Sequence, residues 1–400
     1  MDSASRVRVR GPLAAYSVGF REQLRGQGYA DRSAQTHLLL MAEVSRWLDH
    51  VGVDVGDFTA DRCHEFLGAH HAAGRRFPRS ADGLVPLLEH LQGVGAMPLP
   101  GIPARTPGVE LVERFGVFLA RERGLAAGTI VGYQHVATLM VAALEDLGRE
   151  VGSLTAADVN GFVLAQCAQR SVASAKNLVT GLRALLRFLH VDGITATSLS
   201  GAVVTVSGWN SGLPRGVDAR AIEALRASCD RRTAKGRRDF AILALLTRLG
   251  IRAGEVAALE LGDIDWRSGE IVVRGKGNRL ERLPMPVDVG DALAGYLRRG
   301  RPRTEHPQLF VRVLAPHRRL TVGAISVAVH AACVRAGLPP IGTHRLRHTV
   351  ATELLRRGAA LPEIGQLLRH RSIATTSIYA KVDTVALRQL ARPWPGVDHD

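Results

Sequence analysis

Apolar residues recur at helical spacing through most of the 400-residue chain. In residues 1–96 and again in residues 109–195 they fall at positions i, i+3 and i+4, which predicts about four or five amphipathic helices in each segment. The stretches "FTADR" and "LTAAD" are typical helix starts, with Thr59 and Thr155 as the capping residues. Most of the chain is therefore expected to be helical.

The two helical segments resemble each other. "GYADRSAQTHLLLMAEVSRWL" (28–48) aligns with "GLAAGTIVGYQHVATLMVAAL" (124–144) at an offset of 96 residues, and "FTADRCHEFL" (58–67) aligns with "LTAADVNGFV" (154–163) at the same offset. We interpret the first segment as a duplicate of the second. The alternative is that two small helical bundles share an amphipathic pattern by chance.

The third segment, 213–400, has a mixed pattern. "RDFAILALLTRLG" (238–250) predicts a buried helix, and "EIVVRGKGNRLERLPMP" (270–286) predicts a β-hairpin because a turn separates two strand-like runs. The expected fold class is therefore mainly α with a small β-hairpin or sheet: helical domains followed by a mixed α/β domain. Further helical patterns cover 289–299, 321–336, 344–357 and 362–369.

Charge is concentrated in the C-terminal half of the chain. The formal net charge is +15, and residues 201–400 hold 32 basic against 18 acidic side chains. This excess favours a polyanionic partner, most often nucleic acid, over a merely solvated arginine-rich surface.

The N-terminus lacks a secretory h-region, no long uninterrupted apolar run occurs, and the four cysteines are scattered, so we expect a cytoplasmic protein without a membrane partner.

The stretch "THRLRH" (343–348) holds the first candidate chemistry. His344 and Arg347 are three residues apart, so both can point from one helical face at the same phosphate. An arginine suits this task because its guanidinium stays protonated and donates paired hydrogen bonds. Arg345 and Leu346 face elsewhere, and we expect Leu346 to pack inward.

Four other elements of the basic half complete an ordered set. They are Gly250-Ile251-Arg252 with Glu255, Lys276 in the hairpin, His370, and Tyr379 nine residues later. In this order, with His344 and Arg347, they resemble the signature of the tyrosine recombinases, the phage integrase family. Residues 109–195 resemble the helical, SAM-like core-binding domain of that family, and 213–400 its catalytic domain.

The resemblance implies a covalent mechanism without metal or other cofactor. Tyr379 would attack the scissile phosphate of double-stranded DNA and form a 3′-phosphotyrosyl bond, expelling a 5′-hydroxyl. The covalent bond stores the energy for rejoining, so ATP is not needed. Lys276 would be the acid for the leaving oxygen, because an ammonium gives up a proton and a guanidinium hardly does.

The other residues would surround the phosphate. Arg252 and Arg347 would brace its nonbridging oxygens, and His370 would donate a hydrogen bond to it. His344 would assist proton transfer at the tyrosine, and Glu255 would orient Arg252. Further DNA contacts are predicted from the basic side chains nearby: Arg237, Arg238, Arg279 and Arg345.

The chain departs from the family pattern at one notable position. Arg369 stands directly before His370, where the family commonly has glycine at a tight helix end. We expect a changed local geometry there, with an additional phosphate contact from the arginine. The first box is also altered, with Ile251 in the usual leucine position, which is a mild change.

The predicted function is site-specific recombination by a tetramer on two DNA sites, with a dimer on each, as in an integrase or transposon enzyme. The alternatives are a type IB topoisomerase-like relaxation activity and a catalytically silent DNA-binding regulator.

Taken alone, Tyr379 could be a core aromatic and Lys276 a turn lysine. "CHEFLGAHH" (63–71) lacks zinc-site spacing, so no metal site is expected. The balanced charge of 1–96, with 11 basic and 11 acidic side chains, favours protein contact over DNA binding.

Overall fold

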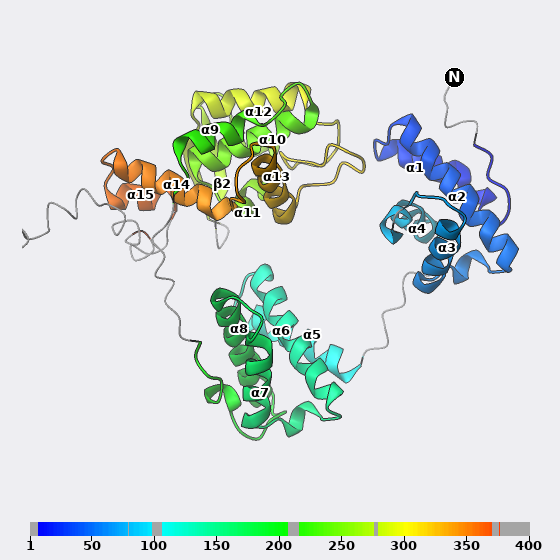
Figure 1. Ribbon diagram of the computed structural model, residues 1–400, viewed down its shortest axis with the longest axis horizontal. Helices are drawn as coiled ribbons and strands as arrows, with labels where there is room; N and C mark the ends of the chain where they lie inside the picture. The colour runs from blue at the N-terminus through cyan, green and yellow to red at the C-terminus, as the bar shows by residue number, and fades with distance from the viewer. Residues whose placement is uncertain are drawn as a thin grey trace, which may run out of the picture. The chain divides into compact units, whose positions relative to one another are not determined.

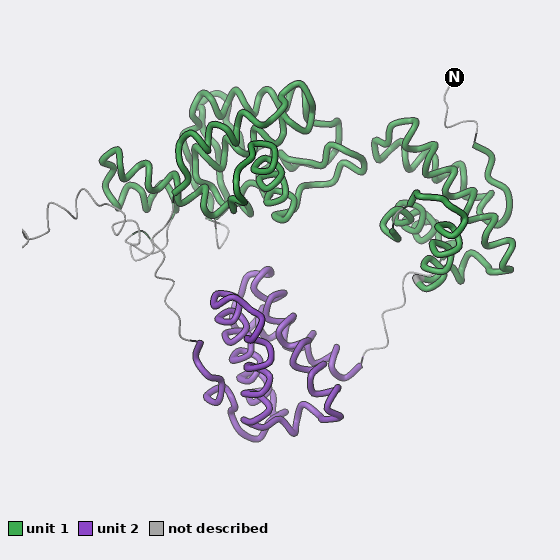
Figure 2. Tube along the Cα trace, in the orientation of Figure 1, with its two compact units in different colours: residues 1–98, 212–400 green, residues 99–211 purple. Residues whose placement is uncertain are grey.

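The computed structural model describes residues 7–78, 80–97, 106–206, 216–275, 279–369 and Thr376. By contacts, these fall into two compact units (Figure 2). Unit 1 comprises Met1–Pro98 and Gly212–Asp400, and unit 2 is Leu99–Ser211. The predicted fold class is confirmed: helices dominate both units, and a small sheet occurs in the C-terminal part of unit 1 (Figure 1).

The N-terminal part of unit 1 is a small helical bundle. Its helices are α1 (Ser17–Gly26), α2 (Asp31–Val51), α3 (Ala60–Ala72) and α4 (Val85–Gly93). They enclose an apolar core that includes Phe20, Met41, Leu48, Phe58 and Leu91. Thr59 precedes α3 as predicted, although its side chain makes no capping hydrogen bond.

Unit 2 is a second bundle with its own core. Its helices are α5 (Pro107–Arg121), α6 (Ala127–Asp146), α7 (Ala156–Cys167) and α8 (Val172–Val191). Thr155 caps α7 as predicted, because its hydroxyl accepts from the backbone of Asp158 while the Asp158 carboxylate accepts from the backbone of Thr155.

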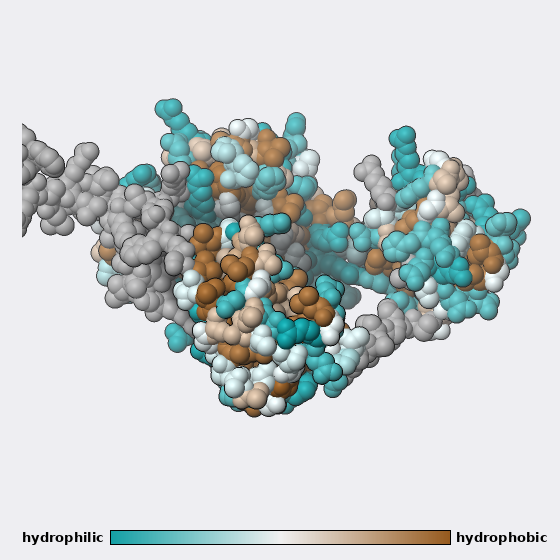
Figure 3. Space-filling model, turned by 60° about the horizontal axis from the view of Figure 1, so that its bottom comes forward, coloured by the Kyte–Doolittle hydropathy of each residue, from teal (hydrophilic) through white to brown (hydrophobic). Residues whose placement is uncertain are grey.

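Helix α6 is long and apolar enough to cross a membrane by length and composition alone. It packs instead against α5 and α8, and Val136, Met140 and Leu144 lie in the core of unit 2. Only 28% of the most apolar window of α6 is buried, so packing accounts for one face of this helix. Unit 2 also exposes some apolar side chains, seen as brown among teal in Figure 3.

The predicted offset of 96 residues recurs in the structure. Helices α2 and α6 start 96 residues apart, as do α3 and α7, and a 3₁₀ turn precedes each of the latter, at Val55–Asp57 and Val151–Ser153. Buried positions follow the same offset, because each of the following pairs is buried in both bundles. The pairs are Leu40/Val136, Met41/Ala137, Val44/Met140, Leu48/Leu144, Phe58/Leu154, Cys63/Val159, Phe66/Phe162 and Leu67/Val163.

The C-terminal part of unit 1 surrounds a three-stranded antiparallel sheet in the order β1-β2-β3. The strands are β1 (Ile264–Asp265), β2 (Glu270–Arg274) and β3 (Leu280–Pro284), so the predicted hairpin is present and a short third strand joins it. The helices are α9 (Ala219–Ala227), α10 (Ala234–Ala244), α11 (Ala253–Ala258), α12 (Val287–Arg299), α13 (Val322–Arg335), α14 (Thr343–Arg356) and α15 (Leu361–Leu367).

The predicted buried helix over 238–250 is only partly regular. Helix α10 continues as a π-helical turn, η7 (Leu245–Leu249), which ends at Gly250 in the left-handed conformation with φ of +60°. Leu245, Leu246 and Leu249 of this turn are buried in the main core. The end of η7 therefore fixes where the chain turns towards Arg252.

Candidate active site

Arg252 stands at the start of α11, where Glu255 holds it. The backbone N–H of Arg252 donates to Oε2 of Glu255 at 2.7 Å, and its Nη1 donates to Oε1 at 2.8 Å. The Glu255 side chain is buried, whereas that of Arg252 is 41% exposed. The carboxylate thus fixes one edge of the guanidinium while the side chain still reaches solvent.

Arg347 is presented differently, from inside the first turns of α14. Leu346 beside it packs fully into the core as predicted, and Arg347 itself is only 2% exposed. Its Nη1 donates to the carbonyl of Gly250 at 2.6 Å, and its Nη2 donates to the carbonyl of Leu368. Arg347 therefore ties α14 to the ends of η7 and α15.

His344 lies close to both arginines. Burial, followed by the positive charges of Arg347 and Arg252, lowers the pKa of His344 below its ordinary value. Its ring meets the ring of His348 edge to face, with 4.6 Å between centroids. The lower pKa favours the neutral imidazole, which can accept a proton. The structure thus brings together Arg252, His344 and Arg347, which are separated by almost a hundred residues in the sequence.

Arg369 points into the protein and pairs with Glu255. Its side chain is 2% exposed, and Nη2 donates to Oε2 of Glu255 at 2.6 Å. Burial alone would raise the pKa of Glu255, but Arg369, followed by the hydrogen bonds of Arg252, holds that pKa below its usual range. Sequence reasoning missed this ion pair, although the unusual arginine marked the position.

Three of the predicted catalytic residues, Lys276, His370 and Tyr379, lie outside the described residues. The described chain stops beside two of them. At the hairpin, the N–H of Gly275 donates to the carbonyl of Arg279 at 2.8 Å, and Lys276 falls between these two residues in the sequence.

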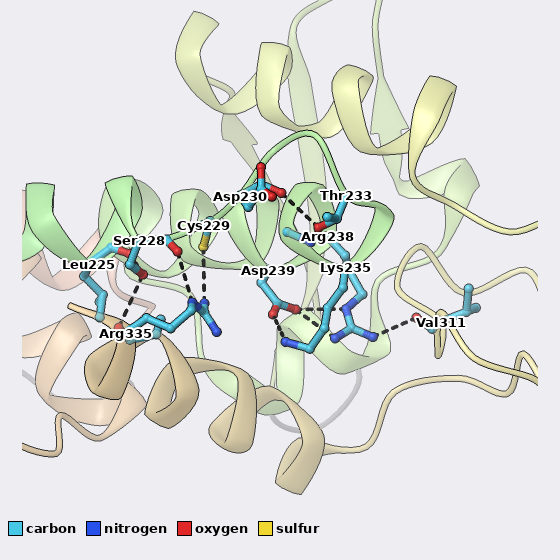
Figure 4. Close-up of polar contacts among 12 residues, drawn as sticks. Leu225, Ser228, Cys229, Asp230, Thr233, Lys235, Arg238, Asp239, Val311 and Arg335 are labelled. Carbon is cyan, nitrogen blue, oxygen red and sulfur yellow. Dashed lines mark hydrogen bonds and ion pairs between the residues drawn. The ribbon is translucent and has the colours of Figure 1, made fainter. Parts of the chain in front are cut away.

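The four predicted DNA contacts have different surroundings. Arg279 and Arg345 are exposed, and Arg237 is half-buried with Nη1 donating to the carbonyl of Arg299 at 2.9 Å. Arg238, by contrast, is buried: it pairs with Asp239 at 2.8 Å and donates to the carbonyl of Val311 (Figure 4). Arg238 is therefore buried and paired inside the fold, unlike the other three arginines.

Within the described ranges, no group of three or more His, Cys, Asp or Glu side chains could hold a metal ion. Two histidines of the "CHEFLGAHH" stretch serve the backbone instead. The ring nitrogens Nε2 of His70 and His71 hydrogen-bond the carbonyls of Phe77 and Pro78, at 2.6 and 2.7 Å.

Comparison with known proteins identifies the family. The profile of the phage integrase family matches residues 216–385. A putative integrase/recombinase of Sinorhizobium fredii, y4rA, is 37% identical over 395 residues, covering 96% of this chain and 95% of that protein. The chain belongs to the tyrosine recombinase family. It is thus a site-specific recombinase, an enzyme that cuts and rejoins DNA.

Two further similarities each cover about 70% of the chain. Tyrosine recombinase XerD of Listeria monocytogenes is 30% identical over 289 residues, covering 70% of this chain and 97% of that protein. A post-cleavage complex of the XerH site-specific recombinase with its palindromic difH substrate shares the fold, with a TM-score of 0.56 at 20% identity, covering 71% of this chain and 84% of XerH. The similarity to y4rA, unlike these two, spans nearly the whole chain.

Proposed function

We propose that Tyr379 is the nucleophile of this recombinase and that Lys276 protonates the leaving 5′-oxygen. The tyrosine oxygen bonds to the scissile phosphorus, the bond to the 5′-oxygen breaks, and the 3′ end stays attached as a phosphotyrosyl ester. Rejoining reverses these steps with a 5′-hydroxyl as nucleophile, so no external energy source enters. The supporting observation is the convergence of Arg252, His344 and Arg347 on one site.

The other residues around the phosphate stabilise charge, transfer a proton or position a neighbouring side chain. Arg252 and Arg347 stabilise the charge that develops on the nonbridging oxygens, as preorganised donors do in many enzymes. His344, kept neutral by its surroundings, accepts the proton of the tyrosine hydroxyl. His370 donates a hydrogen bond to the phosphate, and Glu255 positions Arg252 without touching the substrate.

The DNA partner is a duplex, which this enzyme binds as a multimer. Exchange between two duplexes requires one nucleophile for each strand that is cut, so we propose a dimer on each site and a tetramer on two. The charge supports this assignment, since residues 201–400 hold 32 basic against 18 acidic side chains. Exposed Arg279 and Arg345, together with half-buried Arg237, remain candidates for contacts with the phosphate backbone.

The proposed domain plan has three parts. Residues 213–400 form the catalytic domain, 109–195 form the core-binding domain, and 1–96 form a second copy of the core-binding fold. The matching helix starts and buried positions at an offset of 96 support the duplication. We place the protein in the cytoplasm, where it acts on chromosomal or mobile-element DNA.

The first prediction is that Tyr379→Phe abolishes the covalent adduct. The substitution removes the nucleophilic oxygen and keeps the ring, so binding of a duplex site should persist. The measurement is trapping of protein on a nicked duplex, followed by denaturing electrophoresis, with a mobility-shift assay on the same DNA. An adduct that still forms with the phenylalanine variant would refute the assignment of the nucleophile.

The same assays separate recombination from topoisomerase-like relaxation. A supercoiled plasmid with one site reports relaxation, and a plasmid with two sites reports exchange between them. We expect recombinant products from the second plasmid. Relaxation of both plasmids without any recombinant product would favour the alternative hypothesis of a type IB topoisomerase-like activity.

A further inference from the structure

Arg369 adopts a backbone conformation that disfavours its side chain. Its φ is +54°, and it is the single non-glycine residue with positive φ in the described part of the chain. Glycine reaches this region without steric cost, whereas a residue with a Cβ is strained there. An arginine at this position therefore needs a compensating interaction.

The side chain of Arg369 makes that interaction inside the protein. Its Nη2 donates to Oε2 of Glu255 at 2.6 Å, and its Nη1 donates to the carbonyl of Leu367 at 3.2 Å. Its Nε lies 3.8 Å from a carboxylate oxygen of Glu281 on β3. The guanidinium thus links the end of α15 to α11 and to β3, the strand that follows Lys276 in the sequence.

Glu255 is shared between Arg369 and Arg252. One carboxylate oxygen, Oε2, accepts from both the backbone of Arg252 and Nη2 of Arg369, while Oε1 accepts from Nη1 of Arg252. A buried carboxylate stays ionised only when cations and hydrogen bonds offset its desolvation. The charge of Arg369 is the largest single favourable cause for Glu255, and the hydrogen bonds and charge of Arg252 follow it.

The end of α15 is also bound to the other arginine of the site. The carbonyl of Leu368, next to Arg369, accepts from Nη2 of Arg347. Two consecutive residues after α15 therefore contact the candidate site. Leu368 binds Arg347 through its carbonyl, and Arg369 binds Glu255 through its side chain.

We propose that Arg369 is a positioning residue for DNA cleavage, acting through Glu255 on Arg252. The buried ion pair keeps Glu255 ionised and oriented, so that Arg252 keeps its guanidinium in place for the phosphate. This inference rests on the proposed role of Arg252 in cleavage. It replaces a phosphate contact by Arg369 with an internal one.

The test compares Arg369→Gly with the wild-type full-length chain. Glycine removes the cation and relieves the backbone strain, so we expect the fold to be retained. We expect the rate of adduct formation on nicked duplex to fall by about tenfold or more, the size expected when one charged hydrogen bond is lost. The matched control is Arg357→Gly, which removes an exposed arginine paired with Glu353 at 2.9 Å and should leave the rate unchanged.

The pH dependence distinguishes positioning from a purely structural role. Without Arg369, Glu255 loses a cation that offsets its burial, so its pKa rises, the carboxylate protonates at a higher pH and Arg252 loses its partner. The acid limb of the rate profile should therefore move to higher pH. The charged groups around the pair are Arg252 of α11 and Glu281 of β3, with His344 of α14 close to Arg252.

Two further variants isolate the cause of this shift. Arg369→Lys keeps the positive charge and should recover part of the rate. In a Glu255→Gln background, residue 255 no longer titrates, so adding Arg369→Gly should leave the profile of that background unmoved. His344 titrates in both members of this comparison and cancels.

Two outcomes would overturn the inference. One is an Arg369→Gly rate within about twofold of wild type, far below the loss expected for a charged hydrogen bond. The other is a slower variant whose pH profile is unshifted and which lysine does not rescue. Tyr379→Phe, run in parallel, keeps the proposed function separate: an adduct in that variant refutes the nucleophile, while the effect of Arg369 on the rate is still measured.

Discussion

At the scale of single residues, the guanidinium groups of the two arginines of the candidate site are held in place by different acceptors. Arg252 is partly exposed and is held along one edge by a carboxylate, whereas Arg347 is buried and held by two backbone carbonyls. A carboxylate loses its negative charge when it is protonated, whereas a backbone carbonyl does not titrate. The position of Arg252 therefore depends on pH through Glu255, and that of Arg347 depends on the backbone of Gly250 and Leu368.

A second residue-scale prediction concerns Lys276. If its ammonium protonates the leaving 5′-oxygen, Lys276→Ala should slow cleavage by roughly 10²- to 10⁴-fold, the range typical of a lost general acid. A substrate with sulfur at the 5′-bridging position has a leaving group that needs no proton. The variant should cleave this substrate at nearly the wild-type rate in the same trapping assay, and absence of rescue would mean that Lys276 is not the acid.

At the scale of elements, the turn from η7 into α11 organises the site. The π-helical turn ends at Gly250, whose carbonyl accepts from Arg347, and two residues later Arg252 begins α11. A Cβ at Gly250 would meet a methyl carbon of Leu368 at 3.0 Å. This one turn therefore sets the spacing between the two arginines.

The third prediction follows from that turn. Gly250→Ala should destabilise the chain by about 1–2 kcal/mol, because a Cβ is strained at φ of +60°. Cleavage should also slow, since the carbonyl that holds Arg347 shifts. The measurements are the midpoint of chemical denaturation and the adduct rate. Gly262→Ala is the control, because a Cβ at Gly262 meets nothing within 4 Å. Equal midpoints for the two variants would contradict the argument.

Elements with a strong sequence period could be predicted, and contacts between distant elements could not. The hairpin, Thr155 as a cap and the inward packing of Leu346 follow from local patterns, and the structure has all three. The pairing of Arg369 with Glu255 joins residues 114 positions apart, so no local period reports it. For the same reason the sequence did not distinguish buried Arg238 from its surface neighbours.

At the scale of the whole molecule, the repeated bundle is the least explained part. The offset of 96 residues relates the starts of α2 and α6, the starts of α3 and α7, and a set of buried positions, which supports the proposed duplication. Net charge does not separate the roles of the two bundles. Residues 1–100 hold 11 basic and 11 acidic side chains, and residues 101–200 hold 9 and 8. The charge balance that favoured protein contact for the first bundle describes the second almost equally well.

The last prediction therefore tests the first bundle by removing it. Deletion of residues 1–100 removes the N-terminal part of unit 1 and leaves unit 2, which has its own core, followed by the proposed catalytic domain. We expect the truncated chain to bind a single duplex site and to form the Tyr379 adduct at close to the full-length rate. Complexes that hold two sites, and recombination between them, should be lost, because we assign the first bundle to contacts between protomers.

Native gels with one or two labelled duplexes measure both properties on the same sample. A matched control removes only residues 1–6, which precede the first described residues, and should behave as the full-length chain. Loss of single-site binding on deletion of 1–100 would show that the first bundle binds DNA. It would then have the same role as the proposed core-binding domain, 109–195. Balanced net charge would in that case conceal a local basic surface, because a bound phosphate backbone responds to the charges that face it rather than to their sum.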